Sequence, residues 1–304
     1  MTNLQSIIYI SGSGRSGSTL LERIIHSSDC VSALGEFHCL WRLPETDITC
    51  SCAAPFISDS FWQPVLKTAA IDASVLAELR ELEDRVCRTS FIASHRFDIK
   101  SLRENRDVQH FLDIQFRIFE AVAGASGSSV LVDSSKAGPR AWLMACHPKV
   151  RIIHLYRDPA DVILSWRSAK FDPGMGQEMK RMSVAAAATD WWKVEYLVKR
   201  LGKATPVARV DYGELCARPE RTLGNALAAL SLPTKPAPAW IDATSVKSKD
   251  NYHSLNGNPD RFDKGPIRIS KREADWNKVG PAERLTIIAV AKVLGLMLPS
   301  SPSS

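Results

Sequence analysis

A glycine- and serine-rich run at residues 12–19 has the residue types of an anion-binding loop. It directly follows an apolar, β-branched run at residues 7–10, and apolar residues at helical spacing follow it within residues 20–25. A turn between a strand and a helix points backbone N–H groups inward, and the helix dipole adds positive potential at the same place. We therefore expect this loop to hold an anion among the residues Ser13, Gly14, Arg15, Ser16, Gly17, Ser18 and Thr19.

The loop departs at one place from the nucleotide-binding pattern G-x-x-x-x-G-K-[ST]. Gly12 and Gly17 occupy the two glycine places and Thr19 the hydroxyl place, but Ser18 stands where lysine belongs. In kinases and ATPases that lysine acts with a metal ion on the β- and γ-phosphates. Here the nearest cation is Arg15, inside the loop. The variant suits a donor whose terminal group carries less charge than a γ-phosphate and needs no magnesium.

The apolar run at residues 128–132 predicts a core strand, and polar residues follow it up to Lys136. Binding and catalytic residues concentrate where the parallel strands of an α/β sheet end. Lys136 is therefore a candidate to stabilise negative charge on a transferred group. A solvated surface lysine is the alternative interpretation.

Residues 150–156 predict the strongest internal strand, and Arg157 follows it. Pro159 suits the first turn of a helix, which places Ser165 two turns after Arg157, near enough for one phosphate to contact both. A guanidinium group binds phosphate through two parallel hydrogen bonds. The spacing predicts a second anion site, although Arg157 capped by Asp158 at a strand end is a simpler alternative.

Glu36 is the candidate general base. It follows Gly35 and stands among the apolar residues Leu34, Phe37 and Trp41, so partial desolvation would make its carboxylate more basic than in water. Most glutamates in turns are exposed, and a surface role is the alternative. His38 is a second candidate for the base.

The elements that position these residues follow from hydrophobic periodicity. Helices are predicted over residues 19–27, 74–88, 104–123, 183–201 and 281–296, and a further strand over 207–210. Strands that alternate with helices predict a three-layer, P-loop-like α/β fold with a central, mainly parallel β-sheet. With 304 residues and no internal repeat, we expect a single domain over 1–304, with acceptor-side insertions around 37–125 and 170–183.

Composition narrows the class of partner. A formal net charge of +6 suits an anionic small molecule, and the chain lacks the lysine- and arginine-rich block of a nucleic-acid binder. No apolar run is long enough to cross a bilayer, so we expect no membrane span and a cytoplasmic location. Seven scattered cysteines agree with a reducing compartment. Cys50 and Cys52 are too close for the usual zinc pair and have no matching second pair, which argues against a metal there.

These motifs together resemble those of sulfotransferases that use 3′-phosphoadenosine 5′-phosphosulfate (PAPS). Residues 14–21 resemble the 5′-phosphosulfate loop, and residues 157–165 closely resemble the 3′-phosphate motif. The segment 133–136 is similar to the family's Asp-Ser-Ser-Lys run, and Gly35-Glu36 to the Gly-Glu of its protein-tyrosine and bacterial carbohydrate-type branches. Residues 212–215 match a Tyr-x-Glu-Leu strand end, and 257–262 resemble a Gly-Asn-Pro-x-Arg-Phe segment that folds over the nucleotide.

The resemblance implies transfer of a sulfuryl group from PAPS to an acceptor hydroxyl or amine, without a metal. It assigns proton removal to Glu36 and charge stabilisation to Lys136 and Arg15. The donor contacts it implies are the 5′ loop at residues 13–19, then Arg157, Ser165, Tyr212 and Arg261. A small molecule, carbohydrate, lipid or peptide can be the acceptor, and neither its identity nor the oligomeric state follows from the sequence.

Residues 49–62 are similar to a cysteine-containing insertion of bacterial sulfotransferases, in which a further cysteine often precedes Phe-Trp. Ser60 stands before Phe61 and Trp62 here, and we interpret the segment as a loop over the acceptor side with these two aromatic residues as anchors. Two other functions stay open. One is a magnesium-dependent P-loop kinase, which the missing loop lysine argues against, and the other is a nucleotide-binding protein without catalytic activity.

Overall fold

The computed structural model describes residues 3–45, 49–173, 176–272 and 275–298. Parts of the two expected insertions, residues 46–48 and 174–175, lie outside the described residues. Within the described chain, five strands form one parallel sheet in the order β2-β3-β1-β4-β7. Their bounds are β1 Ser6–Ser11, β2 Val31–Ala33, β3 Val130–Lys136, β4 Val150–Tyr156 and β7 Val207–Asp211. The predicted parallel α/β sheet is confirmed.

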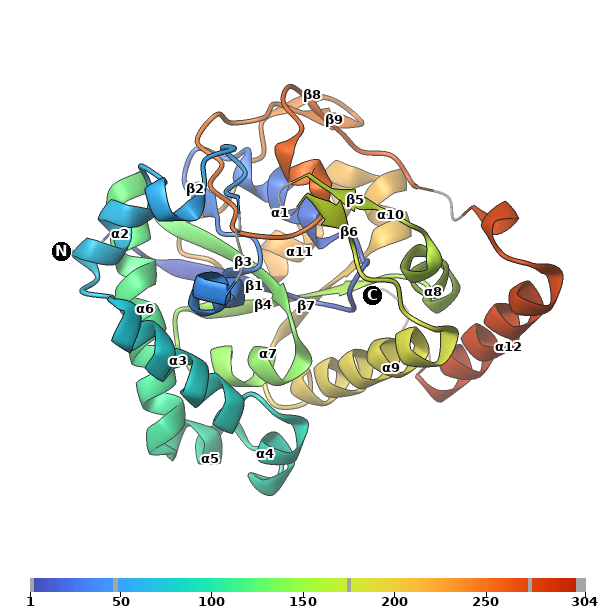
Figure 1. Ribbon diagram of the computed structural model, residues 1–304, viewed down its shortest axis with the longest axis horizontal. Helices are drawn as coiled ribbons and strands as arrows, with labels where there is room; N and C mark the ends of the chain where they lie inside the picture. The colour runs from blue at the N-terminus through green and yellow to red at the C-terminus, as the bar shows by residue number, and fades with distance from the viewer. Residues whose placement is uncertain (1–2, 46–48, 174–175, 273–274, 299–304) are drawn as a thin grey trace.

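Helices cover both faces of the sheet because strand side chains alternate between the faces. Ile7 and Tyr9 of β1 belong to a core with α6 and α7, whereas Ile8 and Ile10 belong to a core with α1 and α11. Figure 1 shows α7 and α9 on one side of the sheet and α1 on the other. The covering helices are α1 Ser18–His26, α6 Arg106–Ser126, α7 Gly138–Met144, α9 Val184–Leu201, α10 Tyr212–Ala217 and α11 Pro219–Ala229.

Shorter elements fill the long connections. Between β2 and β3 the chain forms the 3₁₀ helices η1 Phe37–Glu45 and η2 Phe56–Ser58, and the helices α2 Trp62–Thr68, α3 Ala73–Val86, α4 Thr89–Ser94 and α5 Ile99–Glu104. After β4 come α8 Pro159–Arg167 and the hairpin β5 Phe171–Asp172 and β6 Gln177–Glu178. A small antiparallel sheet of β8 Trp240–Asp242, β9 Ser245–Val246 and β10 Ile267–Arg268, the 3₁₀ helices η3 Pro259–Phe262 and η4 Trp276–Lys278, and α12 Pro281–Met297 complete the described chain.

Two local differences from the sequence expectations affect the site. The strand predicted over 128–132 continues as β3 to Lys136, so the polar run lies within the strand and not after it. The reason is pairing with β1, where Ser11 lies opposite Lys136 after a register shift. The expected insertion around 170–183 contains a two-stranded hairpin, β5-β6, which the sequence did not indicate. No helix of the described residues is long and apolar enough to cross a membrane.

Candidate active site

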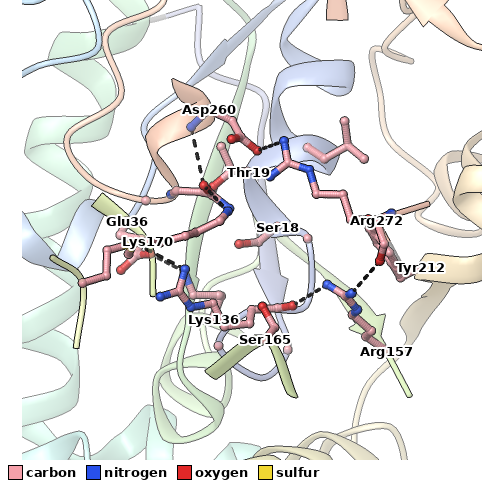
Figure 2. Close-up of a pocket in the computed structure, with 18 of the residues that line it drawn as sticks. Ser18, Thr19, Glu36, Lys136, Arg157, Ser165, Lys170, Tyr212, Asp260 and Arg272 are labelled. Atoms are coloured by element: carbon pink, nitrogen blue, oxygen red, sulfur yellow. Dashed lines mark hydrogen bonds and ion pairs between the residues drawn. The ribbon is translucent and has the colours of Figure 1, made fainter. Parts of the chain in front are cut away.

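The carboxyl-terminal ends of the five strands place the candidate residues in one row. Glu36 follows β2, Lys136 ends β3, Arg15 lies in the loop after β1, Arg157 follows β4, and Tyr212 follows β7. All five line a single cavity of about 1020 Å³. Ligands bind at this edge of parallel sheets, and Figure 2 shows Glu36, Lys136 and Arg157 around the same space. The two arginines that the sequence assigned to opposite ends of one ligand therefore share a cavity.

Glycine lets the loop after β1 lie tightly against its neighbours. Gly17 has φ +99°, and a Cβ there would lie 2.6 Å from the ring of Tyr212. A Cβ on Gly14 would lie 2.4 Å from the Trp166 ring. Both positions therefore exclude a side chain, as expected for a loop whose backbone must approach a ligand closely. Arg15, at φ +66°, adopts the left-handed conformation without being a glycine.

Several buried polar atoms of this loop have no hydrogen-bond partner among the described residues. They are Nε and Nη2 of Arg15 and the hydroxyls of Ser13 and Ser16. The Arg15 guanidinium lies 4.9 Å over the Trp166 ring, and its Nη1 contacts Sδ of Met179 at 3.3 Å. Buried polar groups in proteins are nearly always paired, so the unpaired atoms of Arg15, which lines the cavity, indicate a polar ligand, whereas Ser13 and Ser16 lie outside the cavity lining. Donor groups and positive charge together fit an anion.

Arg157, the candidate for the second anion site, contacts the loop at residues 13–19 directly. Its Nη1 donates to the carbonyl of Arg15 at 3.0 Å, and its Nη2 donates to the carbonyl of Arg272 at 3.3 Å. The guanidinium lies 4.4 Å over the ring of Tyr212. Ser165, two turns along α8, lines the cavity as the spacing predicted. Figure 2 shows Arg157, Ser165 and Tyr212 on this side of the cavity.

Glu36 faces the cavity from a glycine turn. Gly35 has φ +70°, and the Glu36 carboxylate accepts a hydrogen bond from Nζ of Lys136 (Figure 2). Burial alone would raise the pKa of Glu36, but the positive charges of Lys136 and its neighbours hold that pKa below the ordinary value. The expectation of a carboxylate more basic than in water is therefore wrong. The reason is the ion pair, which a residue one hundred positions away supplies.

The end of β3 holds the Glu36 turn in place. Ser134 N donates to the carbonyl of Gly35 at 2.9 Å, and the hydroxyl of Ser135 accepts from His38 N at 3.1 Å. Asp133 in turn binds Ser135 and the buried Arg140. Three residues of the Asp-Ser-Ser-Lys run thus position the turn, and the fourth binds Glu36 itself.

His38 also lines the cavity, so the alternative base is present beside Glu36. Burial lowers its pKa below the ordinary value for histidine. Its Nδ1 has no hydrogen-bond partner among the described residues, and its Nε2 lies 3.8 Å from Sγ of Cys39. A neutral imidazole near neutral pH follows from this environment.

Arg261 is not among the residues that line the cavity, and its assignment as a phosphate contact stays a prediction. Its side chain is buried, and Nη1 donates to the carbonyl of Gly257 at 3.0 Å and contacts Asp172 at 3.4 Å. The residue therefore joins the segment 252–262 to the β5-β6 hairpin. The motif around it still reaches the site, because Asn258 N donates to Oγ1 of Thr19 at 3.1 Å.

Two cationic residues that the sequence did not single out lie at the cavity. Lys170 and Arg272 both line the cavity. Nζ of Lys170 donates to Asn258 at 2.9 Å, and burial lowers the pKa of Lys170 to about 8. Arg272 pairs with Asp260 at 2.8 Å (Figure 2). Neither residue follows a strand of the parallel sheet, so the strand-end argument could not find them.

Described residues of the segment 49–62 do not line the cavity, and the expectation of a loop over the acceptor side stays a prediction. Trp62 is fully buried in the core, and its Nε1 donates to the carbonyl of His253 at 3.1 Å. Phe61 stacks on the ring of His253. The two aromatic residues are anchors, as predicted, but they hold the segment 252–258, which itself borders the cavity.

Comparison with known proteins gives one family and a set of distant structures. Residues 7–236 match the model of the Sulfotransferase family. The sulfotransferase domain of the Synechococcus PCC 7002 olefin synthase is 17% identical, with a TM-score of 0.48 over 97% of this chain and 96% of that chain. The sulfotransferase domain of the curacin biosynthetic pathway is 19% identical, with a TM-score of 0.48 over 94% and 97%. Sulfotransferase STF9 of Mycobacterium avium is 17% identical, with a TM-score of 0.40 over 77% and 65%. No curated protein sequence matches the chain.

Proposed function

This chain belongs to the sulfotransferase family and is an enzyme that transfers a sulfuryl group, and we propose that the transfer takes place in the cavity at the strand ends. PAPS is the general donor of this family. It supplies an activated sulfuryl group on its 5′-phosphate and a second phosphate on its 3′ position. The donor therefore needs two anion sites that are joined within one cavity.

The two ends of the donor bind at the two clusters of unpaired or cationic groups. Backbone amides of residues 13–19 and the free donor atoms of Arg15 hold the 5′-phosphosulfate. Arg157 and Ser165 hold the 3′-phosphate, and the ring of Tyr212 packs against the Arg157 guanidinium. The observation that carries this proposal is the pair of anion sites in one cavity with Glu36 beside them.

Additional positive charge near the donor comes from Lys170 and Arg272, which line the same cavity. These cations offset the donor's charge, so we expect transfer to need no metal ion. Thr19, whose hydroxyl would bind magnesium in a P-loop kinase, instead accepts a hydrogen bond from Asn258 N. Arg261 acts by holding the segment 252–262.

Proton transfer takes place at the Glu36 end. The Glu36 carboxylate accepts the proton of the acceptor hydroxyl or amine while the acceptor atom forms its bond to sulfur. The bond between sulfur and the bridging oxygen breaks, and its electron pair stays on the 5′-phosphate of adenosine 3′,5′-bisphosphate. The Lys136 ammonium stabilises the charge that develops on that oxygen. The acceptor is a hydroxyl or amine on a small molecule, carbohydrate, lipid or peptide.

Lys136 can interact with both the proposed base and the bound donor. In the structure its ammonium binds Glu36 and lowers the pKa of that carboxylate. When the ammonium turns toward a bound phosphosulfate, the carboxylate loses this stabilising charge and its pKa rises. Glu36 thus becomes a stronger base when the donor is present.

Thermal unfolding in the presence of nucleotides tests this function. Adenosine 3′,5′-bisphosphate without metal should raise the melting temperature by several degrees, because a ligand that binds only the folded state stabilises it. Arg157→Ala should lose most of this increase, while Arg218→Ala, at an exposed ion pair with Glu214, should keep it. A larger increase with ATP and magnesium than with the bisphosphate would contradict the proposal and favour a kinase.

A further inference from the structure

Four potential metal ligands meet behind the cavity. Cys50, Cys52 and Asp59 belong to one loop, and His253 comes from the segment 252–258 near the other end of the chain. One ligand atom from each lies within 4.8 Å of all the others. Cys50 and Asp59 are fully buried, so the group is enclosed within the protein.

The separations of these atoms fit a tetrahedral ion. Sγ of Cys50 lies 3.6 Å from Nδ1 of His253, and Sγ of Cys52 lies 3.2 Å from Oδ2 of Asp59. Nδ1 of His253 lies 3.9 Å from the other carboxylate oxygen of Asp59, Oδ1, and one ligand atom from each of the four residues lies within 4.8 Å of the others. Zinc bonds of about 2.0–2.3 Å place neighbouring ligand atoms of a tetrahedron roughly 3.3–3.8 Å apart. The four groups therefore surround a space of the right size with small adjustments.

The backbone around the cysteines is built to bring them to His253. A tight turn with Ala53 at φ +73° connects Cys50 to Ala54 through the hydrogen bond from Cys50 N at 2.9 Å. The hydroxyl of Ser51, which stands between the two cysteines, donates to the carbonyl of Tyr252 at 2.6 Å and accepts from Ser254 N at 2.8 Å. Both neighbours of His253 are thus fixed to the residue between the two thiols.

Neighbouring groups also orient the two remaining ligands. Oδ1 of Asp59 accepts from the backbone N–H groups of Phe61 and Trp62 at 2.8 and 3.0 Å, which directs Oδ2 toward Cys52. The His253 ring stacks on Phe61 with a centroid distance of 4.4 Å and an interplanar angle of 8°. Such outer contacts are typical of metal sites, where they fix ligand orientation.

We propose that Cys50, Cys52, Asp59 and His253 bind one zinc ion that has a structural role. Two thiolates with an imidazole and a carboxylate match the ligand preference and tetrahedral geometry of zinc. Four protein ligands leave no open position for substrate, so the ion takes no part in sulfuryl transfer. The proposal departs from the sequence argument against a metal at Cys50 and Cys52, because the neighbours of these cysteines are Asp59 and His253 and not a second cysteine pair.

The zinc ion would fix one wall of the active site. From His253 the chain continues to Leu255, whose N–H donates to the carbonyl of Leu34 at 3.1 Å, and to Asn256, whose carbonyl accepts from Glu36 N at 3.4 Å. Two residues later Asn258 binds Thr19. Binding of the ion therefore restrains a segment that contacts both the candidate base and the phosphate loop.

Metal analysis of the purified full-length chain tests the site. After reconstitution with zinc and removal of excess ion, mass spectrometry should find about one zinc ion per chain. Cys52→Ala and His253→Ala should each reduce this content at least tenfold. Cys87→Ala serves as the matched cysteine control and should retain the ion. Cys39→Ala should retain it too, which separates the site from the neighbouring group of Glu36, His38 and Cys39.

Cobalt substitution keeps the test decisive if the variants do not fold. Cobalt bound to the wild-type chain should show thiolate-to-metal charge-transfer absorption and the visible bands of a tetrahedral ion. Absence of these bands, zinc far below one per chain, or loss of zinc in Cys39→Ala but not in Cys52→Ala would overturn the proposal. None of these measurements depends on sulfuryl transfer, so the outcome is separate from that of the proposed function.

Discussion

The two ends of the cavity are formed by different kinds of contact. At the phosphate end, backbone groups of one continuous loop and guanidinium groups at adjoining strand ends form the site, and Arg157 binds the loop directly. At the base end, Glu36 and its turn depend on two distant parts of the chain, namely Lys136 and Ser135 on β3 and the backbone carbonyl of Asn256. The phosphate end is set by local geometry, whereas the base end is set by tertiary contacts.

This difference indicates where each kind of change should act. A donor site made of backbone should tolerate few changes in its glycines, because added atoms collide with buried neighbours. A base held by an ion pair should respond most to changes in charge. The predictions below test this division, starting with the largest expected effect.

Replacing the base should affect turnover far more than donor affinity. Glu36→Gln keeps the size of the side chain but removes the proton acceptor, so kcat should fall about 10²–10⁴-fold. Affinity for adenosine 3′,5′-bisphosphate, measured by calorimetry, should be equal or higher because Lys136 is released from its ion pair. Glu178→Gln, on the exposed hairpin strand β6, is the control. Turnover within threefold of wild type would remove Glu36 from the role of base.

Adding a methyl group to the loop should weaken donor affinity more than it slows turnover. Gly17→Ala would force alanine into φ +99° with its Cβ 2.6 Å from the Tyr212 ring. Backbone strain of about 1–3 kcal/mol corresponds to a loss of roughly 5–150-fold in affinity for the bisphosphate, which calorimetry would measure. Gly224→Ala in α11 meets no neighbour within 4 Å and should bind normally. Equal affinities in the two variants would show that the loop backbone is more adaptable than its contacts indicate.

The smallest expected effect concerns pH. Burial lowers the pKa of Lys170 to about 8, so its ammonium is charged below that pH and neutral above it. An anionic donor binds the charged form better, and affinity should fall by up to about tenfold between pH 7 and 9. Lys170→Met should abolish this dependence and bind weakly throughout, while Lys203→Met on the surface should behave as wild type. A wild-type affinity that rises with pH would contradict the assigned direction.

Prediction from sequence succeeded for features that local patterns determine. The strands at β1, β4 and β7 and the helix that begins at Pro159 depend on apolar runs and on a proline at a first turn, and they form as expected. The meeting of residues 13–19 with Arg157 followed from parallel strand ends. These features follow from short-range sequence patterns and from the fact that parallel strands end at the same edge of a sheet.

Features that depend on distant partners were not predictable from the same patterns. The sequence predicted a raised pKa for Glu36. Its pKa is lowered instead, because the positive charge of Lys136, one hundred positions away in the sequence, outweighs the effect of burial. Arg261 turns into the protein because Asp172 lies there, and Lys170 and Arg272 line the cavity instead. Cys50 and His253 are 203 positions apart, so no local spacing could reveal their meeting.

The ion pair between Lys136 and Glu36 has a consequence for kinetics. In the proposed mechanism the Lys136 ammonium leaves the carboxylate for the phosphosulfate, so an acceptor that arrives before the donor would meet a base that is still paired with Lys136. We therefore expect compulsory order, with the nucleotide adding first and leaving last. Initial-rate patterns with a dead-end acceptor analogue would then show uncompetitive inhibition against the nucleotide.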